Sequence, residues 1–174
     1  MSRQPLVLDA CLVITFGSTE RLDLLIDAPV ERVVVAARVF AEVTRPPSRD
    51  LLEAAVNDSR IQIEAIDLDR RTEQEAFARF NARPAFRDRG EAEVLALAVA
   101  RNYIVGSDER PVRTATIQEL GLQRIAGSLD VLIWAIRDGR LSLVEAEALV
   151  NHLDSGEGIQ RLLRVHGTRL SELL

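Results

Sequence analysis

The sequence contains no lysine, a single cysteine and no long apolar run. One cysteine, Cys11, excludes an internal disulfide bond and a zinc site built from several cysteines. No apolar run approaches the length of a transmembrane helix, and the opening residues Met-Ser-Arg-Gln-Pro lack the apolar segment of a signal peptide. We therefore expect a cytoplasmic protein with no membrane partner.

The absence of lysine leaves arginine as the only strong cation. The 22 arginines face 27 acidic residues, which gives a net charge of −5. This balance is unusual for a free-standing nucleic-acid binder, because phosphate contacts need cations. Arginines gathered in one patch grip phosphate bidentately whatever the net charge, whereas codon choice in a GC-rich genome also gives an arginine-only chain. The absence also excludes a response-regulator receiver, which needs a lysine late in its sheet.

Short apolar runs alternate with stretches of helical spacing along the 174 residues, whose 47% apolar content suits one sizeable core. The alternation predicts an α/β fold, namely a doubly wound three-layer α/β/α sandwich with a parallel sheet and a helical C-terminal appendage. We expect residues 1–127 to form the core and residues 128–174 to form a helical segment packed on the same domain. The expected strands are residues 6–8, 33–35, 61–65, 104–105 and 123–126, and the expected helices are residues 11–16, 21–26, 36–44, 50–56, 68–80, 91–101, 112–120, 128–137 and 142–153.

Acidic residues stand where the predicted strands and helices meet. Asp9 ends the first apolar run, Asp108 follows the fourth predicted strand, and Glu42 lies in the helix after the second. Glu91 and Glu93 open an almost entirely apolar helix. Open parallel sheets carry functional groups at the carboxyl ends of their strands, so we expect these acids to converge. Converging carboxylates repel one another unless a cation neutralises them, and Mg²⁺ or Mn²⁺ takes such oxygen ligands. The pattern indicates a metal-dependent site that cleaves phosphodiester bonds.

Each acid also has a purely structural explanation. Asp9 could do no more than cap the helix that follows it, Glu42 could face solvent, and Asp108 could belong to a turn. Glu91 or Glu93 suits the N-terminus of a helix electrostatically. All of these coincidences together are much rarer than any one of them.

Four motifs resemble the PIN domain, and more narrowly its VapC-like subgroup with a G-E-x-E signature. The likeness covers roughly residues 6–153, and the motifs follow one another in the family's order. They are Asp9-Ala10-Cys11-Leu12-Val13-Ile14, Val39-Phe40-Ala41-Glu42-Val43, Gly90-Glu91-Ala92-Glu93 and Gly106-Ser107-Asp108-Glu109-Arg110.

The resemblance implies a Mg²⁺- or Mn²⁺-dependent endoribonuclease, most often the toxin of a VapBC-like toxin–antitoxin pair. It implies RNA as the substrate, a cognate antitoxin protein as a partner, and a homodimer. Carried over position by position, Asp9, Glu42, Glu91 and Asp108 match the family's acidic quartet, as catalytic residues and as metal ligands. Residues 1–127 would then be a PIN-like nuclease core.

Glu91 and Glu93 compete for the third acidic position. Two residues apart on a helix, they point about 200° away from each other, so we do not expect both to bind one ion. The step from Glu91 to Asp108 is closer to the family's spacing than the step from Glu93. Glu91 is therefore the predicted ligand, and Glu93 is the alternative or a support behind the ligands.

Two positions depart from the family's pattern. Cys11 stands where Ser, Thr or Asn is frequent, and Gly106 stands where Ser or Thr is frequent, with Ser107 beside it. We expect Cys11 to be a small apolar filler inside the first helix. These departures favour an alternative function, a catalytically weak PIN-like module that binds nucleic acid or protein.

Arginines flank the proposed site in the sequence and could grip the phosphates of a substrate. We assign substrate binding to Arg89, Arg110 and Ser107. Solvated loop and helix charges are the alternative explanation. Further arginines in the same segments are Arg83, Arg87 and Arg113, whereas His152 and His166 lie in the helical tail, away from the motifs.

The first two predicted helices carry many apolar side chains. They present more apolar surface than one sheet face is expected to cover, so part of it should meet a second subunit. An antitoxin arginine could occupy the acid cluster, because the same carboxylates that bind a metal also bind a guanidinium. The apolar residues concerned are Leu12, Val13, Phe16, Leu22, Leu25 and Ile26.

Overall fold

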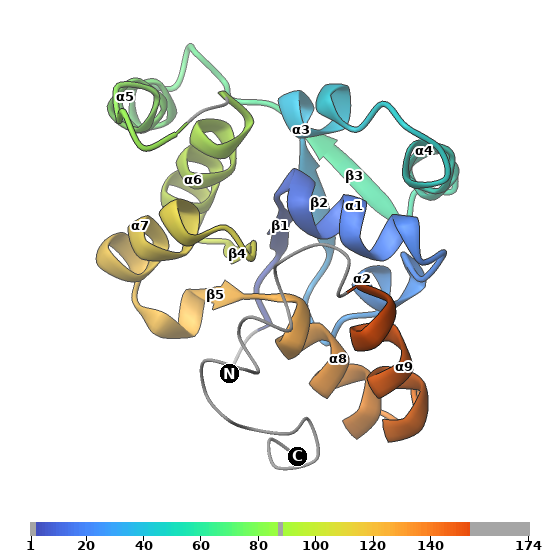
Figure 1. Ribbon diagram of the computed structural model, residues 1–174. Helices are drawn as coiled ribbons and strands as arrows, with labels where there is room; N and C mark the ends of the chain where they lie inside the picture. The colour runs from blue at the N-terminus through green and yellow to red at the C-terminus, as the bar shows by residue number, and fades with distance from the viewer. Residues whose placement is uncertain (1–2, 87–88, 154–174) are drawn as a thin grey trace.

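A parallel sheet forms the centre of the protein (Figure 1). The computed structural model describes residues 3–86 and 89–153, and in these residues five parallel strands run in the order β3-β2-β1-β4-β5. In the middle, Leu8 of β1 pairs with Val35 of β2 on one side and with Gly106 of β4 on the other. The strands are β1 (Leu6–Leu8), β2 (Val33–Ala36), β3 (Ile61–Glu64), β4 (Ile104–Gly106) and β5 (Ile125–Ala126).

The order of the strands reverses between β1 and β4. From β1 the chain steps outward through β2 to β3, and it then returns to the other side of β1 as β4 before it ends the sheet with β5. Adjacent strands whose connections leave in opposite directions open a crevice at their carboxyl ends. Asp9 follows β1 directly and Ser107 follows β4 directly, so both lie at this switch point.

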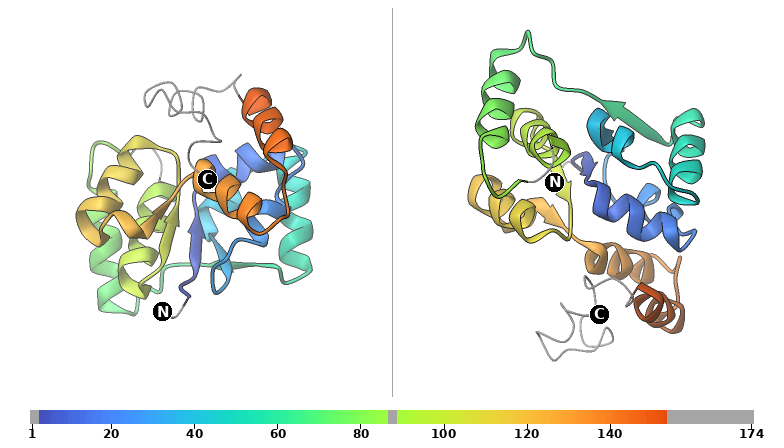
Figure 2. Two further views of the ribbon diagram at one scale, coloured as in Figure 1. Left: turned by 90° about the horizontal axis from the view of Figure 1, so that it is seen from below. Right: turned by 45° about the horizontal axis from the view of Figure 1, so that its top comes forward.

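Helices cover both faces of the sheet, which confirms the predicted three-layer α/β/α sandwich (Figures 1 and 2). On one face α6 contacts β1, β2 and β4, and α5 and α7 pack against α6. On the other face α1 packs with α4, and the short α3 that follows β2 contacts both α6 and α1. The helices are α1 (Ala10–Ser18), α2 (Asp23–Ile26), α3 (Ala37–Glu42), α4 (Ser48–Asn57), α5 (Arg71–Asn81), α6 (Arg89–Arg101) and α7 (Arg110–Leu120).

The C-terminal part of the described chain is a helical hairpin of α8 (Ser128–Arg137) and α9 (Leu143–Leu153). Gly139 takes a φ of 69° in the turn between them, a conformation that favours glycine. The Ser142 hydroxyl accepts from the Glu145 N–H at 3.2 Å, and the Glu145 carboxylate accepts from the Ser142 N–H at 2.8 Å, which makes a capping box. The hairpin contacts α2 through α8, and Figure 2 shows both helices beside the sheet rather than on its α6 face.

Several element boundaries differ from the predicted ones for local reasons. Helix α5 begins at Arg71 rather than at residue 68, because the Asp67 carboxylate accepts from the Asp69 N–H at 3.0 Å and closes a turn instead. Residues 122–124 form a 3₁₀ turn, named η1, so the last strand is only Ile125–Ala126. Arg89 and Gly90, which we expected in a loop, are the first residues of α6.

The apolar residues of α1 and α2 are buried within the chain. Five of the six side chains named as a surface for a second subunit are at most 3% exposed, namely Leu12, Val13, Phe16, Leu22 and Leu25. The expectation that a second subunit is needed to cover these side chains was wrong, because α4 covers α1 and α8 covers α2 in the same subunit. In the part of the chain that the structure describes, no helix is long and apolar enough to cross a membrane.

An ion-pair network joins α5, α6 and β3. The Glu73 side chain is only 2% exposed, and its carboxylate accepts from the Arg101 guanidinium at 2.8 Å and 3.0 Å. Arg101 also donates to Glu64 at the end of β3, at 2.6 Å. The hydrogen bond from Arg101 holds the pKa of Glu73 below its ordinary value of 4.5.

Replacing Arg101 should expose the strength of this network. Arg101→Ala leaves the Glu73 carboxylate buried without its main cation, and we expect it to lower the free energy of unfolding by about 3 kcal/mol at pH 7. A carboxyl whose pKa is lowered in the folded state stabilises the fold above its unfolded pKa and loses this effect as the pH falls. The difference between the two proteins should therefore shrink below pH 4.5.

Urea unfolding at several pH values measures both effects. Arg71→Ala is the matched control, because Arg71 pairs with Glu75 on the surface, where the two side chains are 88% and 63% exposed. We expect it to change stability by less than about 1 kcal/mol. Equal losses for the two variants at pH 7 would contradict the role given to the network.

Candidate metal centre

Asp9 is the buried acid at the switch point of the sheet. It is the N-cap residue of α1 and only 2% exposed, and its Oδ1 accepts from the Ala10 N–H at 2.8 Å. Its Oδ2 accepts from the Ser107 hydroxyl at 2.7 Å. Burial raises the pKa of Asp9 above its ordinary value, and the nearby charge of Glu109 raises it further, against the hydrogen bonds that favour ionisation. The capping explanation is correct for Oδ1, whereas Oδ2 points across the crevice to β4.

Ser107 and Cys11 complete the surroundings of Asp9. The Cys11 Sγ lies 3.3 Å from Asp9 Oδ2 and 3.5 Å from the Ser107 Oγ, and it accepts from the Asp108 N–H at 3.4 Å. Cys11 packs against the apolar core, as expected of a filler, but helix α1 also turns its sulfur toward the end of β4. A side chain at position 106 would meet Leu8 and Leu12 in the core, so the hydroxyl near Asp9 comes from Ser107 and not from position 106.

Glu109 joins this group, although the sequence did not lead us to name it as a ligand. Asp9, Cys11 and Glu109 each present a ligand atom within 4.8 Å of the other two. Glu109 could have been found from its place in the sequence, because it is an acid that directly follows the predicted ligand Asp108. Burial raises the pKa of Cys11 well above its ordinary value, so the thiol is protonated near neutral pH. The possible ligands are therefore mainly the carboxylate oxygens of Asp9 and Glu109. Such a set suits Mg²⁺ or Mn²⁺.

Asp108 turns its carboxylate toward the start of α8. Its Oδ1 accepts from the Ser128 N–H at 2.9 Å, and its Oδ2 accepts from the Ser128 hydroxyl. Gly127 permits this approach, because a Cβ at that position would lie 2.5 Å from Asp108 Oδ1. Ser128 is therefore a second residue that the motifs did not reveal, since it fixes Asp108 from a distant part of the sequence.

The first turn of α6 carries Glu91 and receives the Glu42 side chain. Glu42 is the last residue of α3, and its carboxylate lies against Gly90, where a Cβ would be 2.6 Å from Oε2. Glu91 is the next residue along α6 and is 7% exposed. The exposed N–H groups at the start of a helix favour negative charge, so this turn suits two carboxylates.

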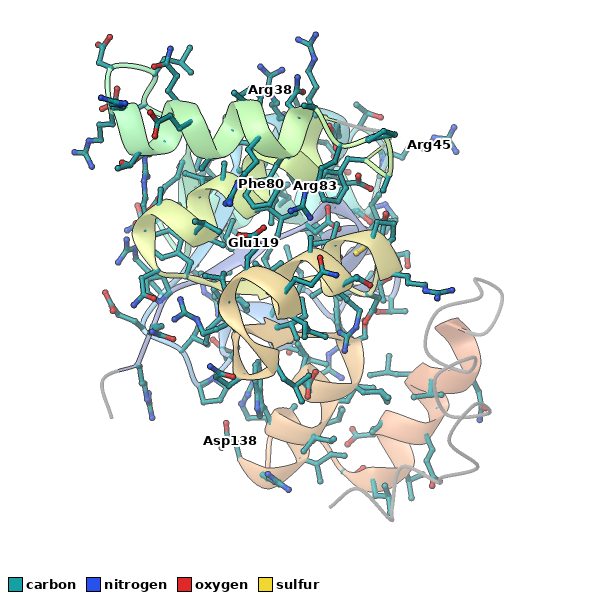
Figure 3. All side chains as sticks on the ribbon, turned by 90° about the vertical axis from the view of Figure 1, so that its left-hand side faces the viewer. Arg38, Arg45, Phe80, Arg83, Glu119 and Asp138 are labelled. Atoms are coloured by element: carbon teal, nitrogen blue, oxygen red, sulfur yellow. The ribbon has the colours of Figure 1, made fainter. Side chains whose placement is uncertain are left out.

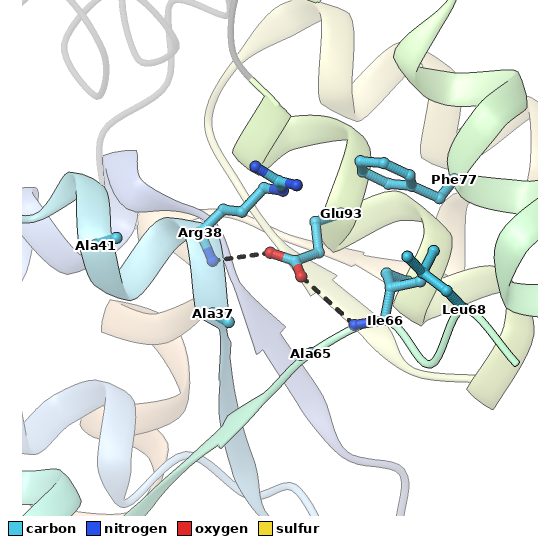
Figure 4. Close-up of a pocket in the computed structure, with 8 residues that line it drawn as sticks. All are labelled: Ala37, Arg38, Ala41, Ala65, Ile66, Leu68, Phe77 and Glu93. Atoms are coloured by element: carbon cyan, nitrogen blue, oxygen red, sulfur yellow. Dashed lines mark hydrogen bonds between the residues drawn. The ribbon is translucent and has the colours of Figure 1, made fainter.

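Glu93 points toward the start of α3 and the segment after β3. Its carboxylate accepts from the Arg38 N–H at 2.8 Å and from the Ile66 N–H at 3.4 Å (Figure 4). These bonds tie α6 to the start of α3 and to the segment after β3. Glu93 thus has a structural task of its own.

The arginines of the flanking segments fall into two groups. Arg89 and Arg110 are the first residues of α6 and α7, and both are exposed. Arg83 pairs with Glu119 at 2.8 Å beside Phe80 (Figure 3), and Arg113 donates to the Ser107 carbonyl at 3.1 Å. Arg87 lies outside the described residues, as do the side chain of His152 and all of His166. The side chains of Arg89 and Arg110 are therefore open to solvent, whereas those of Arg83 and Arg113 are held by contacts within the fold.

Comparison with known families agrees with this architecture. A family model described as a PIN domain matches residues 5–161, which include the whole sheet and all the acids above. The chain belongs to the PIN domain family. A comparison with curated proteins found no match. PIN domains are commonly nucleases that use divalent metals, and the mainly oxygen-donor group at the switch point of this PIN domain fits such an ion.

Asp9→Asn should stabilise this PIN domain when no divalent ion is present. Because burial raises the pKa of Asp9, its ionisation opposes folding at neutral pH, and each pKa unit of the rise is worth about 1.4 kcal/mol. Asparagine is also a good N-cap residue, so α1 should keep its first turn. We expect a higher unfolding temperature for Asp9→Asn at pH 7 in EDTA.

The sign of the pH dependence provides a check. A carboxyl with a raised pKa opposes folding only above its unfolded pKa, so the advantage of Asp9→Asn should fade as the pH approaches 3.8. Asp138→Asn is the control, because Asp138 is an exposed acid after α8, at the bottom of Figure 3. A lower unfolding temperature for Asp9→Asn than for wild type at pH 7 would contradict the assigned cause.

Proposed function

We propose that this PIN domain is a Mg²⁺- or Mn²⁺-dependent endoribonuclease. The observation that carries the proposal is the buried Asp9 carboxylate at the switch point, with ligand atoms of Glu109 and Cys11 within 4.8 Å of it. A buried acid with a second carboxylate beside it is poorly stable as a pair of anions, and a divalent cation removes that penalty. A strand end in an open α/β sheet is also where such folds carry their ligands.

Asp9, Glu42, Glu91 and Asp108 are the proposed catalytic residues and metal ligands, and Glu109 joins them on the evidence of its position. When bound, the ion would supply a more acidic water and neutralise charge on the phosphate. Ser107 holds Asp9 and Ser128 holds Asp108, so both carboxylates are oriented before any ion arrives. Glu93 supports α3 from behind the site and is not proposed as a ligand.

The exposed arginines at the helix starts would position the RNA. Arg89 stands one residue before the Gly90 contact with Glu42, and Arg110 follows Glu109. Guanidinium groups beside an acidic centre bind the phosphates on either side of the cleaved bond. Ser107 is the third proposed substrate-binding residue, but its hydroxyl is engaged with Asp9, so it would act on the substrate through that carboxylate.

We further propose that the enzyme is the toxin of a VapBC-like pair, acting on RNA in the cytoplasm. An arginine of the antitoxin would bind the acid cluster in place of the metal, so inhibition should weaken as Mn²⁺ increases. A homodimer is proposed as well, although the buried α1 and α2 residues do not supply its interface.

The alternative is a catalytically weak module that binds nucleic acid or protein. The position of the Cys11 sulfur beside Asp9 favours it, because a thiol with a raised pKa is a poor ligand for Mg²⁺. Cys11→Ser should then increase metal-dependent cleavage, since a hydroxyl is the harder donor.

Removing either central aspartate should abolish cleavage. We expect Asp9→Asn and Asp108→Asn to lower Mn²⁺-dependent cleavage of a labelled single-stranded RNA by at least about a hundredfold, an effect typical of losing one charge-stabilising group from an active site. Asp138→Asn, made on the surface after α8, should cleave at the wild-type rate. The assignment fails if both central variants stay active while remaining folded. A wild type that binds RNA without cutting it would support the alternative.

A further inference from the structure

A pocket of about 370 Å³ lies between α3 and α6. It is bounded by α3, the segment after β3, α5 and α6, and Figure 4 shows the side chains that line it. Its walls are mainly apolar, and its volume is at the low end for small-ligand pockets. The lining residues are Ala37, Arg38, Ala41, Ala65, Ile66, Leu68, Phe77 and Glu93.

We propose that this pocket binds one base of the RNA strand whose phosphodiester bond is cleaved at the acid centre. The proposal rests on the ribonuclease function proposed above and names a subsite for it. The pocket and the acid centre share two helices. Ala41 of the pocket precedes Glu42 on α3, and Glu93 of the pocket lies two residues after Glu91 on α6. The base of a nucleotide in a strand held at the acid centre is therefore proposed to enter the pocket.

The walls suit the faces of a flat aromatic group. The Phe77 ring forms one wall, and the Arg38 guanidinium lies 5.5 Å from the centre of that ring (Figure 4). Arg38 is exposed, so its side chain can move to let a base stack on Phe77 and then cover it. Aromatic rings and guanidinium planes are the surfaces on which unpaired RNA bases stack. Leu68, which lines the pocket just before α5, is 62% exposed.

The charges of the pocket argue for a neutral occupant that donates hydrogen bonds. Glu93 places a carboxylate among the apolar walls, which disfavours an anion and a purely aliphatic side chain. Arg38 disfavours a cation. Two backbone N–H groups hold the Glu93 carboxylate, and its oxygens keep lone pairs for further donors. A base with two stacking faces and an amino group at its edge meets all of these conditions.

The carboxylate also predicts which pyrimidine binds better. Cytosine presents an N4 amino donor at its edge, whereas uracil carries a carbonyl oxygen at the corresponding position. A carboxylate accepts from the amino group and is repelled by the carbonyl. Hexacytidylate and hexauridylate carry the same strand charge and differ at this position and at the adjacent N3, so comparing them separates recognition of the base edge from the effect of strand charge.

The test measures binding to labelled single-stranded RNA by fluorescence anisotropy. The protein carries Asp9→Asn to prevent cleavage, and each further change is made on that background. The three strands are hexacytidylate, hexauridylate and an abasic strand of equal length and charge. We expect hexacytidylate to bind at least about fivefold more tightly than the abasic strand, which is the lower end for one base stacked on an aromatic ring. Hexauridylate should lie between them.

Phe77→Leu should remove most of this preference and leave binding of the abasic strand unchanged, and Phe77→Tyr should restore it. Phe40→Leu is the matched control, because Phe40 lies on the same helix α3 as Arg38 and is also covered by an arginine, Arg49, at 4.2 Å, but it does not line the pocket. Unfolding temperatures of the leucine variants verify that both are folded.

Each outcome decides between the proposals. Equal affinity of Phe77→Leu and its parent for all three strands would overturn the base pocket, and it would favour an aromatic side chain of a partner protein as the occupant. Metal-dependent cleavage by the protein with an intact Asp9 would then still support the ribonuclease function. No binding of any strand, together with no cleavage, would overturn both proposals.

Discussion

The site depends on one contact between two parallel strands. The Asp9 N–H donates to the Gly106 carbonyl at 2.9 Å, which extends the β1–β4 ladder one residue beyond the pairing of Leu8 with Gly106. This bond places the Asp9 carboxylate opposite Ser107, at the only junction in the described sheet where neighbouring connections diverge. The carboxylate is buried there because helices close over both faces, so the same packing that builds the core also creates the unfavourable charge that a divalent ion would neutralise.

Helix starts and small residues let the other acids approach. Asp9 caps α1, Asp108 accepts from the first residue of α8, and Glu42 lies against the first turn of α6, so three helix N-termini face the acidic groups. Their N–H groups offset part of the negative charge without removing it. Two of these approaches need a glycine, since a side chain at Gly90 or Gly127 would collide with a carboxylate. These contacts within the fold hold the carboxylates in place.

Local patterns predicted the parts of the structure that local forces determine. The apolar runs became buried parallel strands, Asp9 lies at the switch point, and Ser142 with Glu145 capped α9. The failures share a different cause, namely contacts between residues distant in the sequence. The side of α1 on which Cys11 lies depends on β4, the burial of Phe16 depends on α4, and the orientation of Asp108 depends on Ser128. The spacing of residues within one segment does not reveal such long-range contacts. Glu109 is different, because its place directly after Asp108 is visible in the sequence.

Crystals grown with Mn²⁺ test the central claim most directly, because the anomalous signal of manganese locates the ion independently of the protein atoms. We expect a peak at the carboxyl ends of β1 and β4, within coordinating distance of an oxygen of Asp9, and loss of that peak in crystals of Asp9→Asn. An ion bound elsewhere on the surface, or no peak beside Asp9 in fully folded wild-type protein at millimolar Mn²⁺, would contradict it.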